Sequence, residues 1–382
     1  MIKRIRIRNF KSLRDVDLEL RKINVIVGPN GSGKSNLVDF FIFLKELINP
    51  SSFPSDPFQT FGGYEEAVFL RDTSLPISFE ICGENFQYSA DISGKNGFTI
   101  NREMLTYKDF LLVRTLNSVE INYVRIRSIL RASLQPTMSI FSLSPESTSF
   151  YQNPMAKNSL DKVKELFDFM SSFVKSFIPL RVNPERAFTP VHYSYPEKLE
   201  VDGYGLARIF DYILARKGLP EQISIFLKEN NLSMDRYTSQ ESGNIVLVTR
   251  ELIPDLNKTL PLRPRNVPAG IIKMITILFA IYALEPSPSL VIIDEIENSL
   301  HLKFIEELAS VISYSPPQFI ITTHSPMVID MFNPEDIILF YKEKGETKAE
   351  RIKDTEKLKE KLIEKGLTLS EWIFYSPNPI NP

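Results

Sequence analysis

Two runs of aliphatic residues stand out in the hydrophobic pattern of the chain, because each leads directly into polar residues. Ile23 to Val27 leads into Gly28-Pro29-Asn30-Gly31-Ser32-Gly33-Lys34-Ser35, and Leu290 to Ile293 leads into Asp294-Glu295. Short apolar runs bounded by turn residues are typical of strands that are buried in a sheet. The pattern therefore predicts two core strands with these polar residues at their carboxyl ends.

The segment after the first strand fits the phosphate-loop pattern at every position. Its glycines tolerate positive φ and close approach, so the backbone amides can surround an anion. Lys34 is placed to reach the β and γ phosphates of a nucleotide, and Ser35 to offer a hydroxyl to Mg²⁺. The helix predicted from about Lys34 to Ile48 points its positive end at the phosphates. The alternative is a chance Gly-rich turn, which the preceding strand and following helix argue against.

The second strand ends in candidates for hydrolysis. Asp294 closes an all-aliphatic run, where an unpaired carboxylate would be costly to bury, so we expect it to face a solvated or cationic site, which beside a phosphate loop is Mg²⁺. Glu295 is placed to polarise the water that attacks the γ phosphate, with a simple helix cap as the alternative. His324 follows the buried run Gln318 to Thr323 and could sense or orient the γ phosphate; a structural histidine is the alternative. For His301 the structural interpretation is at least as good.

Composition changes this picture little. The 382 residues carry 45 basic and 47 acidic side chains, a formal net charge of −2, so no global basic field indicates nucleic acid. Cys82 is the only cysteine, which excludes an intrachain disulfide and a multi-cysteine metal site. The first residues alternate charged and aliphatic side chains, unlike a signal peptide, and the apolar stretch 271–284 contains Lys273 and is too short to span a bilayer. We expect a cytoplasmic protein with no membrane segment.

The predicted fold is an α/β phosphate-loop head interrupted by an insertion. Residues 1–100 form its N-terminal half, in which alternating runs near Ile77, Phe86 and Phe98 predict an antiparallel sheet. Residues 101–260 are predicted to be a largely helical insertion that contacts a second copy, a partner or nucleic acid. Residues 261–382 complete the head. No heptad repeat is sustained, so no long coiled coil is expected.

Two sets of arginines raise the question of nucleic-acid binding. Alternation of Ile2, Ile5 and Ile7 with arginine predicts a half-buried strand whose other face is basic. A solvated face is favoured over nucleic acid for both sets, which are Arg4, Arg6, Arg8, and then Arg114, Arg125, Arg127 and Arg131.

Several segments together resemble a known family: Ile7-Arg8-Asn9-Phe10-Lys11-Ser12-Leu13, Gly28 to Asn36, Ile293-Asp294-Glu295-Ile296-Glu297-Asn298-Ser299-Leu300-His301, and Thr322-Thr323-His324-Ser325-Pro326. The chain resembles the ABC-type ATPases of the OLD-like group, which are related to SMC heads. More narrowly, it is similar to the stand-alone AAA-21 (AAA ATP-binding, ABC-like) proteins, often paired with a nuclease or toprim partner in prokaryotic anti-phage defence. The resemblance covers about residues 1–100 and 260–382.

This resemblance implies two heads that sandwich two ATP molecules, with a signature segment of one head closing on the nucleotide of the other. It implies nucleotide contacts from Asn30, Gly31, Ser32, Gly33, Lys34, Ser35 and Asn36, and metal contacts from Ser35 and Asp294. The signature falls at Val267-Pro268-Ala269-Gly270, where Pro268 replaces the usual serine. Hydrolysis is therefore expected to be slow. Gln59 is the nearest candidate for a glutamine-loop residue.

The sequence thus predicts a Mg²⁺-dependent ATPase in which Lys34, Glu295 and His324 are catalytic. It would act as a homodimer or higher oligomer, a switch or sensor controlling an effector such as a nuclease or toprim protein in defence or DNA maintenance. One alternative is a nucleotide-binding assembly scaffold with negligible turnover. The other is a DNA-repair ATPase of the SMC-related kind, and DNA binding is left open.

Overall fold

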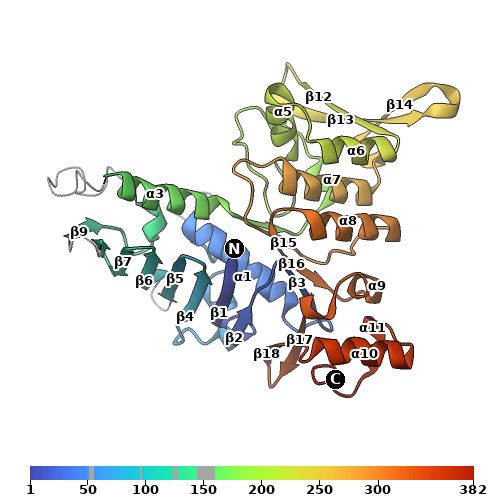
Figure 1. The fold of residues 1–382 in the computed structure, drawn as a ribbon. Coiled ribbons are helices and arrows are strands. Elements are labelled where there is room, and N and C mark those ends of the chain that lie inside the picture. The colour runs from blue at the N-terminus through green and yellow to red at the C-terminus, as the bar shows by residue number, and fades with distance from the viewer. Residues whose placement is uncertain (51–55, 95–96, 124–127, 144–159) are drawn as a thin grey trace.

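Two sheets and a small lobe make up the computed structural model, in which residues 1–50, 56–94, 97–123, 128–143 and 160–382 are described (Figure 1). The first sheet has eight antiparallel strands and the second has six mostly parallel strands, while a four-stranded sheet belongs to the lobe. Short 3-10 turns link the elements at Gln59–Phe61, Phe69–Arg71, Ile140–Ser142, Pro254–Leu256, Pro264–Asn266 and Pro334–Asp336.

The antiparallel sheet lies on one side of the molecule, blue to teal in Figure 1. In spatial order its strands are β2 (Leu13–Glu19), β1 (Ile2–Phe10), β4 (Ile77–Gly83), β5 (Phe86–Ser93), β6 (Thr99–Tyr107), β7 (Phe110–Thr115), β8 (Ser118–Tyr123) and β9 (Ser128–Ser133). The alternation in β1 has the predicted effect, because Ile5 and Ile7 are fully buried. The arginines between them pair with β2 across the sheet, as in Arg4 to Asp17 and Arg6 to Asp15, so this face is a solvated ion-pair ladder.

The central sheet brings the two predicted core strands close together. Its spatial order is β10 (Phe177–Leu180), β15 (Leu290–Ile293), β16 (Gln318–Thr323), β3 (Ile23–Val27), β17 (Ile337–Glu343) and β18 (Glu346–Arg351). Strands β10, β15, β16, β3 and β17 are parallel, and β18 returns antiparallel in a hairpin. Carboxyl ends of parallel strands share one edge, so residues 28, 181, 294 and 324 begin loops at the same edge.

Alternate residues of the central sheet feed two separate cores. Ile26, Ile292 and Ile320 face the core that contains the antiparallel sheet, helix α1 (Lys34–Ile48) and helix α3 (Leu160–Lys175). Val25, Ile293 and Ile321 face the other core, which is built by the helices α5 (Leu206–Arg216), α6 (Glu221–Glu229), α7 (Ala269–Tyr282), α8 (Leu302–Tyr314) and α9 (Pro326–Ile329). Both faces of the sheet are covered, which explains why its strands are continuous apolar runs. The predicted α/β phosphate-loop head is confirmed.

The segment 101–260 differs from the prediction of a largely helical insertion. Strands β7 to β9 continue the antiparallel sheet, β10 joins the central sheet, and a lobe follows with β11 (Val191–His192), β12 (Leu232–Thr238), β13 (Asn244–Ile253), β14 (Lys258–Leu262) and the short helix α4 (Pro184–Ala187). One reason is that the β7 to β8 turn has no Gly or Pro: Leu116 itself adopts φ 50°. Hairpins are recognised in sequence chiefly by such turn residues.

Arg114 is another departure, because it does not lie on a solvated or basic face. Its side chain is fully buried between strands, where it pairs with the equally buried Glu103. Arg131 is exposed and pairs with Glu120, while Arg125 and Arg127 lie outside the described residues. Alternation in β7 places residue 114 on the same face as buried Phe110 and Leu112, so the strand period decides its burial.

The C-terminal segment closes one end of the head. Helix α10 (Thr355–Lys365) is mostly exposed, and α11 (Leu369–Tyr375) buries Trp372 in the core. The remaining helix is α2 (Tyr64–Ala67). Among the described residues, none of the helices has the length and apolar character needed to span a bilayer.

Candidate functional site

The loop between β3 and α1 has the backbone that its glycines predict. Gly31 and Gly33 have φ of 79° and 107°, a region that side-chain-bearing residues adopt rarely. Lys34 is buried, and its Nζ donates hydrogen bonds to the carbonyl oxygens of Gly28 at 2.7 Å and Pro29 at 3.1 Å. The Lys34 ammonium is therefore held inside its own loop.

Acidic residues that follow β15 affect the pKa of the same lysine. Burial lowers the pKa of Lys34, while the negative charges of Glu295, Glu297 and Asp294 oppose that shift. The predicted phosphate-binding lysine and the predicted hydrolytic acids thus lie close enough to interact electrostatically. This is the convergence that the two apolar strands predicted.

A polar network beneath the loop was missed in the sequence. Thr347 of β18 donates from Oγ1 to the Ser32 carbonyl at 2.8 Å and contacts the Ser12 hydroxyl at 2.7 Å. Asn36 donates from Nδ2 to the same Ser12 Oγ at 2.6 Å. A Cβ at Gly33 would lie 2.1 Å from Thr347 Oγ1, so the glycine is required by this packing. Asn36, predicted to contact nucleotide, is here used to hold the loop from below.

Other predicted nucleotide-binding residues differ in accessibility. Asn30 and Gly31 are exposed at the tip of the loop, while Ser35 is partly exposed at the start of α1. Ser32 is buried, and its hydroxyl has no hydrogen-bond partner in the described part of the chain. A buried hydroxyl without a hydrogen-bond partner is unfavourable, so such hydroxyls are typical of sites where a bound ligand completes the hydrogen bonds.

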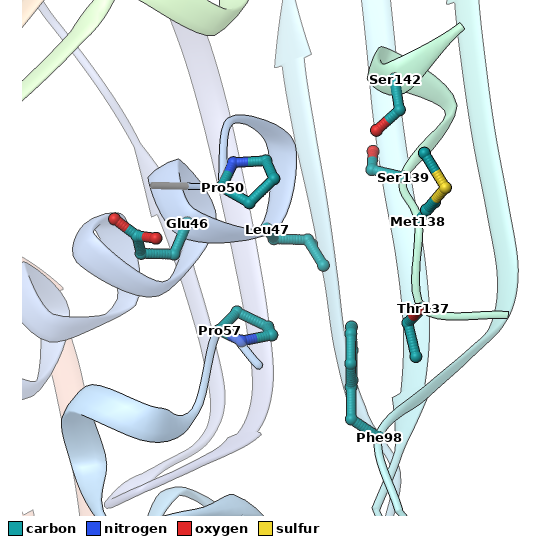
Figure 2. A pocket seen from close by; sticks show the side chains of 9 residues that line it. All are labelled: Glu46, Leu47, Pro50, Pro57, Phe98, Thr137, Met138, Ser139 and Ser142. Atoms are coloured by element: carbon teal, nitrogen blue, oxygen red, sulfur yellow. The ribbon is translucent and has the colours of Figure 1, made fainter. Parts of the chain in front are cut away.

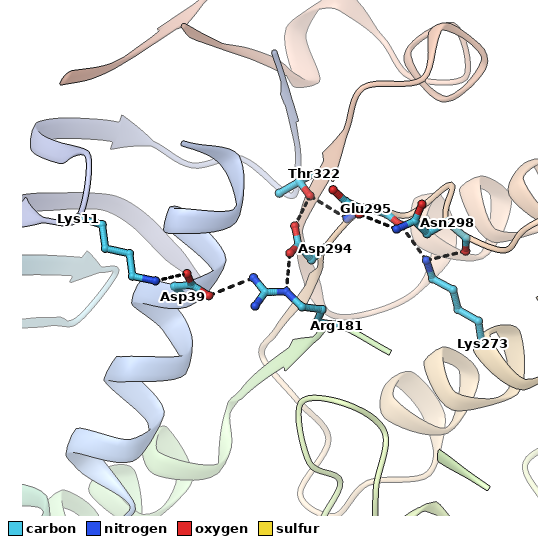
Figure 3. Close-up of polar contacts among 8 residues, drawn as sticks. All are labelled: Lys11, Asp39, Arg181, Lys273, Asp294, Glu295, Asn298 and Thr322. Carbon is cyan, nitrogen blue, oxygen red and sulfur yellow. Dashed lines mark hydrogen bonds and ion pairs between the residues drawn. The ribbon is translucent and has the colours of Figure 1, made fainter. Parts of the chain in front are cut away.

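Asp294 lies at the centre of an ion-pair chain that sequence reasoning missed (Figure 3). Its Oδ2 accepts from Arg181 Nε at 2.8 Å, and its Oδ1 accepts from Thr322 Oγ1 at 2.6 Å. Arg181 also donates from Nη2 to Asp39 Oδ1 at 3.0 Å, and Lys11 contacts the other oxygen of Asp39 at 2.5 Å. The cation that Asp294 faces in the structure is the Arg181 guanidinium, and its role in holding Mg²⁺ stays a prediction.

Glu295 has a backbone that is fixed on both sides. Its φ is 46°, which costs a non-glycine residue on the order of 1 kcal/mol. The Glu295 amide donates to Thr322 Oγ1 at 2.8 Å, and its carbonyl accepts from Lys273 Nζ at 2.7 Å. Asn298 donates from Nδ2 to Glu295 Oε2 at 2.5 Å. These contacts hold the turn in its positive-φ conformation, and strain of this kind is found at functional sites.

Lys273 holds this turn from helix α7. Its Nζ also donates to the Asn298 carbonyl at 2.9 Å, and the residue is almost completely buried. Burial lowers the pKa of Lys273 to about 8, although Glu297, Glu295 and Asp294 act in the opposite direction. The sequence analysis had noted Lys273 only as a charge within an apolar stretch.

His324 is held by a residue that the sequence analysis did not single out. Glu297 Oε1 accepts from the His324 backbone amide at 2.8 Å and lies 2.9 Å from its ring Nδ1. The other oxygen, Oε2, is buried with no partner among the residues that the structure describes. His324 is half exposed, so its ring is accessible at the edge of the sheet. His301 caps the first turn of α8, in agreement with a structural role.

The signature-like segment lies at the start of α7. Pro268 is the residue before the first helical turn, and no side chain caps that turn. A Cβ on Gly270 would lie 2.6 Å from the Ser299 carbonyl, so the glycine allows α7 to pack closely on the loop after Asp294. Gln59, the tentative glutamine-loop residue, is exposed in a 3-10 turn. Arg181, at the exit from β10, is instead the residue next to Asp294.

The donor set fits a nucleotide-borne divalent cation. A hydroxyl at Ser35 and the carboxylate of Asp294 are hard oxygen donors, and Mg²⁺ commonly takes its remaining oxygens from phosphates and water. No cluster of three or more His, Cys, Asp or Glu residues that could hold a metal alone is present in the described ranges. The residues therefore fit a metal that arrives with phosphate better than a dedicated metal centre.

A separate cavity between the end of α1 and residues 137–142 is too small for a nucleotide (Figure 2). Its volume is about 20 Å³, which holds about one water. Its lining is mixed, with Leu47, Phe98 and Met138 beside the polar residues Thr137 and Ser142. The open edge of the central sheet remains the candidate site.

Comparison with known proteins agrees with this geometry. Residues 1–348 match the family described as the RecF/RecN/SMC N terminal domain. The OLD nuclease of Thermus scotoductus is 24% identical over 205 residues, which is 47% of this chain and 39% of that protein. Chromosome partition protein Smc of Methanocaldococcus jannaschii is 48% identical over 44 residues, 11% of this chain and 4% of that protein. The chain thus spans less than half the length of these curated relatives.

Solved structures of SMC heads also align along most of the chain. The SMC head bound to the C-winged helix domain of ScpA is 14% identical, with a TM-score of 0.49, and covers 94% of this chain and 99% of its own. The SMC head domain of Thermotoga maritima is 15% identical, with a TM-score of 0.40, and covers 92% and 99% respectively.

Proposed function

The chain belongs to the RecF/RecN/SMC N-terminal domain family and is an SMC-related, ABC-type ATPase head; from this premise, we propose that it binds and slowly hydrolyses ATP with Mg²⁺ as a dimeric switch. In this proposal residues 1–100 and 261–382 are the two halves of the head, and β7 to β10 from the segment between them complete its sheets. Residues 101–260 supply contacts to a second copy, to a partner or to nucleic acid. The switch would control a separate effector of the nuclease or toprim class, in anti-phage defence or DNA maintenance.

One observation carries the proposal: β3 and β15 both pair in parallel with β16, so the loop that holds Lys34 and the turn that holds Asp294 and Glu295 begin at the same edge of the sheet, although they are far apart in sequence. A lysine in a phosphate loop, an acid at the end of a nearby strand and a second acid on a fixed turn are the elements that phosphoryl transfer to water requires. The Glu295 turn is braced by Thr322 and Lys273, so its carboxylate is pre-positioned.

Each residue has a proposed role. Lys34 would leave the Gly28 and Pro29 carbonyls to bind phosphate oxygens, while Ser35 and Asp294 would hold Mg²⁺. The bound cation would neutralise phosphate charge. Glu295 would orient water and accept its proton, and His324, oriented by Glu297, would contact the γ phosphate.

The test is Glu295→Gln, which keeps the shape and the hydrogen bond to Asn298 but removes the base. We expect ATP turnover to fall by about 10² to 10⁴-fold, with binding of a fluorescent ATP analogue retained. Glu306→Gln is the matched control, because Glu306 is an exposed glutamate of the nearby helix α8. Turnover equal to the parent in Glu295→Gln would remove Glu295 from its role.

The partner class and the dimer rest on separate support. The sequence similarity to an OLD nuclease favours a nuclease-linked role. The proposed sandwich predicts that Glu295→Gln, which would trap ATP, elutes as a dimer with Mg²⁺ and ATP and as a monomer without them. Elution unchanged by nucleotide would contradict a nucleotide-controlled dimer.

A nucleotide-binding scaffold with negligible turnover is the second candidate. Pro268 favours it, because a proline before α7 cannot supply the hydroxyl that the family signature brings to the γ phosphate. Tight ATP binding with less than one phosphate released per chain would support the scaffold over the enzyme. In that case the roles of Lys34, Ser35 and Asp294 in binding would stand, and that of Glu295 would not.

A further inference from the structure

Arg181 lies at the edge of the central sheet where residues 28, 181, 294 and 324 begin loops, which we call the nucleotide edge. The proposed function does not use the contacts of Arg181. This residue follows β10 directly and lies beside Asp294 because β10 and β15 are parallel neighbours in register, with Leu180 opposite Ile293. Its guanidinium is shared between Asp294, at 2.8 Å from Nε, and Asp39 on helix α1, at 3.0 Å from Nη2 (Figure 3). One cation thus serves two carboxylates from different elements.

The burial of the three side chains is unequal. The side chains of Asp294 and Asp39 are 4% and 10% exposed, whereas that of Arg181 is 47% exposed. A buried carboxylate without a counterion is strongly unfavourable, so both acids depend on cations. Arg181 has access to solvent and can move without becoming desolvated, but Asp294 then needs another cation. A divalent metal held with nucleotide is the cation that the proposed function supplies there.

Asp39 gives Arg181 a partner after such an exchange. Asp39 is also bound by Lys11 through its second oxygen, so it is already a fixed anionic anchor. The main chain at this point is tied down, because the Arg181 amide donates to the Val201 carbonyl at 2.7 Å and the Asn183 amide to the Asp202 carbonyl at 2.9 Å. Any exchange must therefore be a movement of the Arg181 side chain.

We propose that Arg181 is a built-in counterion of Asp294 that excludes divalent metal in the nucleotide-free protein, and that it moves from Asp294 to Asp39 when metal and nucleotide bind together. This inference rests on the proposed function. Arg181 is a positioning residue in this scheme, because it sets how much metal is needed and does not touch the reacting atoms. The exchange links metal loading to the α1 helix and to the entry of the lobe, which begins immediately after Arg181.

The test measures the Mg²⁺ concentration that half-maximally tightens binding of fluorescent mant-ADP to the full chain, starting from EDTA. Arg181→Gln removes the competing cation, so the Mg²⁺ midpoint should fall by about tenfold, the typical worth of one charge-assisted hydrogen bond. Asp39→Asn removes the carboxylate to which Arg181 moves, so its midpoint should rise a fewfold. The gain in Tm on adding Mg²⁺ to the ADP-bound protein should change in parallel and does not depend on turnover.

Arg186→Gln is the matched control, since Arg186 lies nearby on α4 and pairs with exposed Asp202. Its midpoint should equal that of the parent. If Arg181→Gln does not fold, Arg181→Met serves, because it keeps an unbranched side chain without the charge and should likewise lower the midpoint. A midpoint that is unchanged or raised in the Arg181 variants, or one that falls in Asp39→Asn, would overturn the proposal. A parent chain that binds no mant-ADP would instead refute the proposed function itself.

Discussion

Two clusters in which an arginine pairs with acidic side chains, Arg114 with Glu103 and Arg181 with Asp294 and Asp39, differ in how exposed they are and in how completely the polar atoms around them are paired. In the antiparallel sheet, Glu103 and Arg114 are both fully buried. Glu103 accepts from Tyr88 at 2.8 Å, Ser139 at 2.5 Å and the Ile140 amide at 2.9 Å. At the nucleotide edge, Arg181 remains half exposed, and its carboxylate partners belong to different elements.

The unpaired atoms are also distributed unequally. Ser32 Oγ and Glu297 Oε2, two of the buried side-chain atoms without a partner in the described part of the chain, lie at or beside the nucleotide edge. Neither Glu103 nor Arg114 leaves such an atom. Buried polar groups are normally satisfied, so the closed network around Glu103 is a structural feature. The unpaired atoms of Ser32 and Glu297 lie where the proposed nucleotide would bind. Thr249 Oγ1 and Glu335 Oε2 also lack a hydrogen bond within the described residues, and they lie elsewhere. The comparison makes opposite predictions for substitutions in the two clusters.

The largest expected effect on stability is at the closed cluster. Arg114→Met leaves Glu103 buried without its counterion, so the free energy of unfolding should fall by about 3 to 5 kcal/mol. Burial raises the pKa of Glu103 and lowers that of Arg114, which shows that neither charge has solvent to replace its partner. Urea unfolding measures the loss, and mant-ADP affinity should be unchanged.

Arg131→Met provides the control for this prediction. Arg131 pairs with Glu120 within the same sheet, but its side chain is 78% exposed. Exposed pairs contribute at most about 1 kcal/mol, so this variant should be close to the parent. An Arg114 variant with parental stability, or with altered nucleotide affinity, would contradict the division into structural and functional clusters.

A smaller and pH-dependent effect is expected at Lys273, which braces the Glu295 turn. Because the folded pKa is lowered to about 8, the unfolded chain holds a proton that the folded chain lacks between about pH 8 and pH 10.5. Stability from this group therefore rises with pH across that window, by on the order of 2 to 3 kcal/mol. In Lys273→Met the rise is absent, so the stability difference between parent and variant should grow with pH.

Urea unfolding at pH 7.5 and pH 10 measures this difference for parent, Lys273→Met and the control Lys303→Met, an exposed lysine of α8. Only the Lys273 variant should show a pH-dependent difference. A stability difference between parent and Lys273→Met that stays constant with pH would mean that the Lys273 ammonium is not desolvated in the folded chain.

The sequence predicted the parts of the site that depend on local pattern. The loop before Lys34, helix α1 and the strand ending at Asp294 are consecutive residues whose spacing carries the information. The antiparallel sheet was predicted only as far as its alternation was bounded by glycine. Beyond Tyr107 the turns at Lys108 and Leu116, which have positive φ without glycine, hid the next two hairpins, and a helical insertion was expected instead.

What could not be predicted are partners that meet only through the fold. Arg181, Asp39 and Lys11 are brought together by three different elements, and no spacing in the chain relates them. Ser12 and Thr347 meet under the loop across the full length of the head. Glu297 was visible in the motif after Asp294, but its contact with His324 depends on the adjacency of β15 and β16.

The smallest expected effect is at Glu297, where Oε1 accepts a hydrogen bond from the His324 amide and Oε2 has no partner among the described residues. Glu297→Gln keeps an oxygen that can accept from the His324 amide and ring, but it loses the charge-assisted part of the bond. That part is worth about 1 kcal/mol, so kcat for ATP should fall about fivefold while KM and Tm stay close to the parent. Glu297→Ala removes the acceptor altogether and should lower kcat further. A purely structural Glu297 would change Tm and leave kcat intact. Comparing the change in kcat with the change in Tm therefore decides whether the unpaired oxygen of Glu297 belongs to the catalytic site or is only a packing defect.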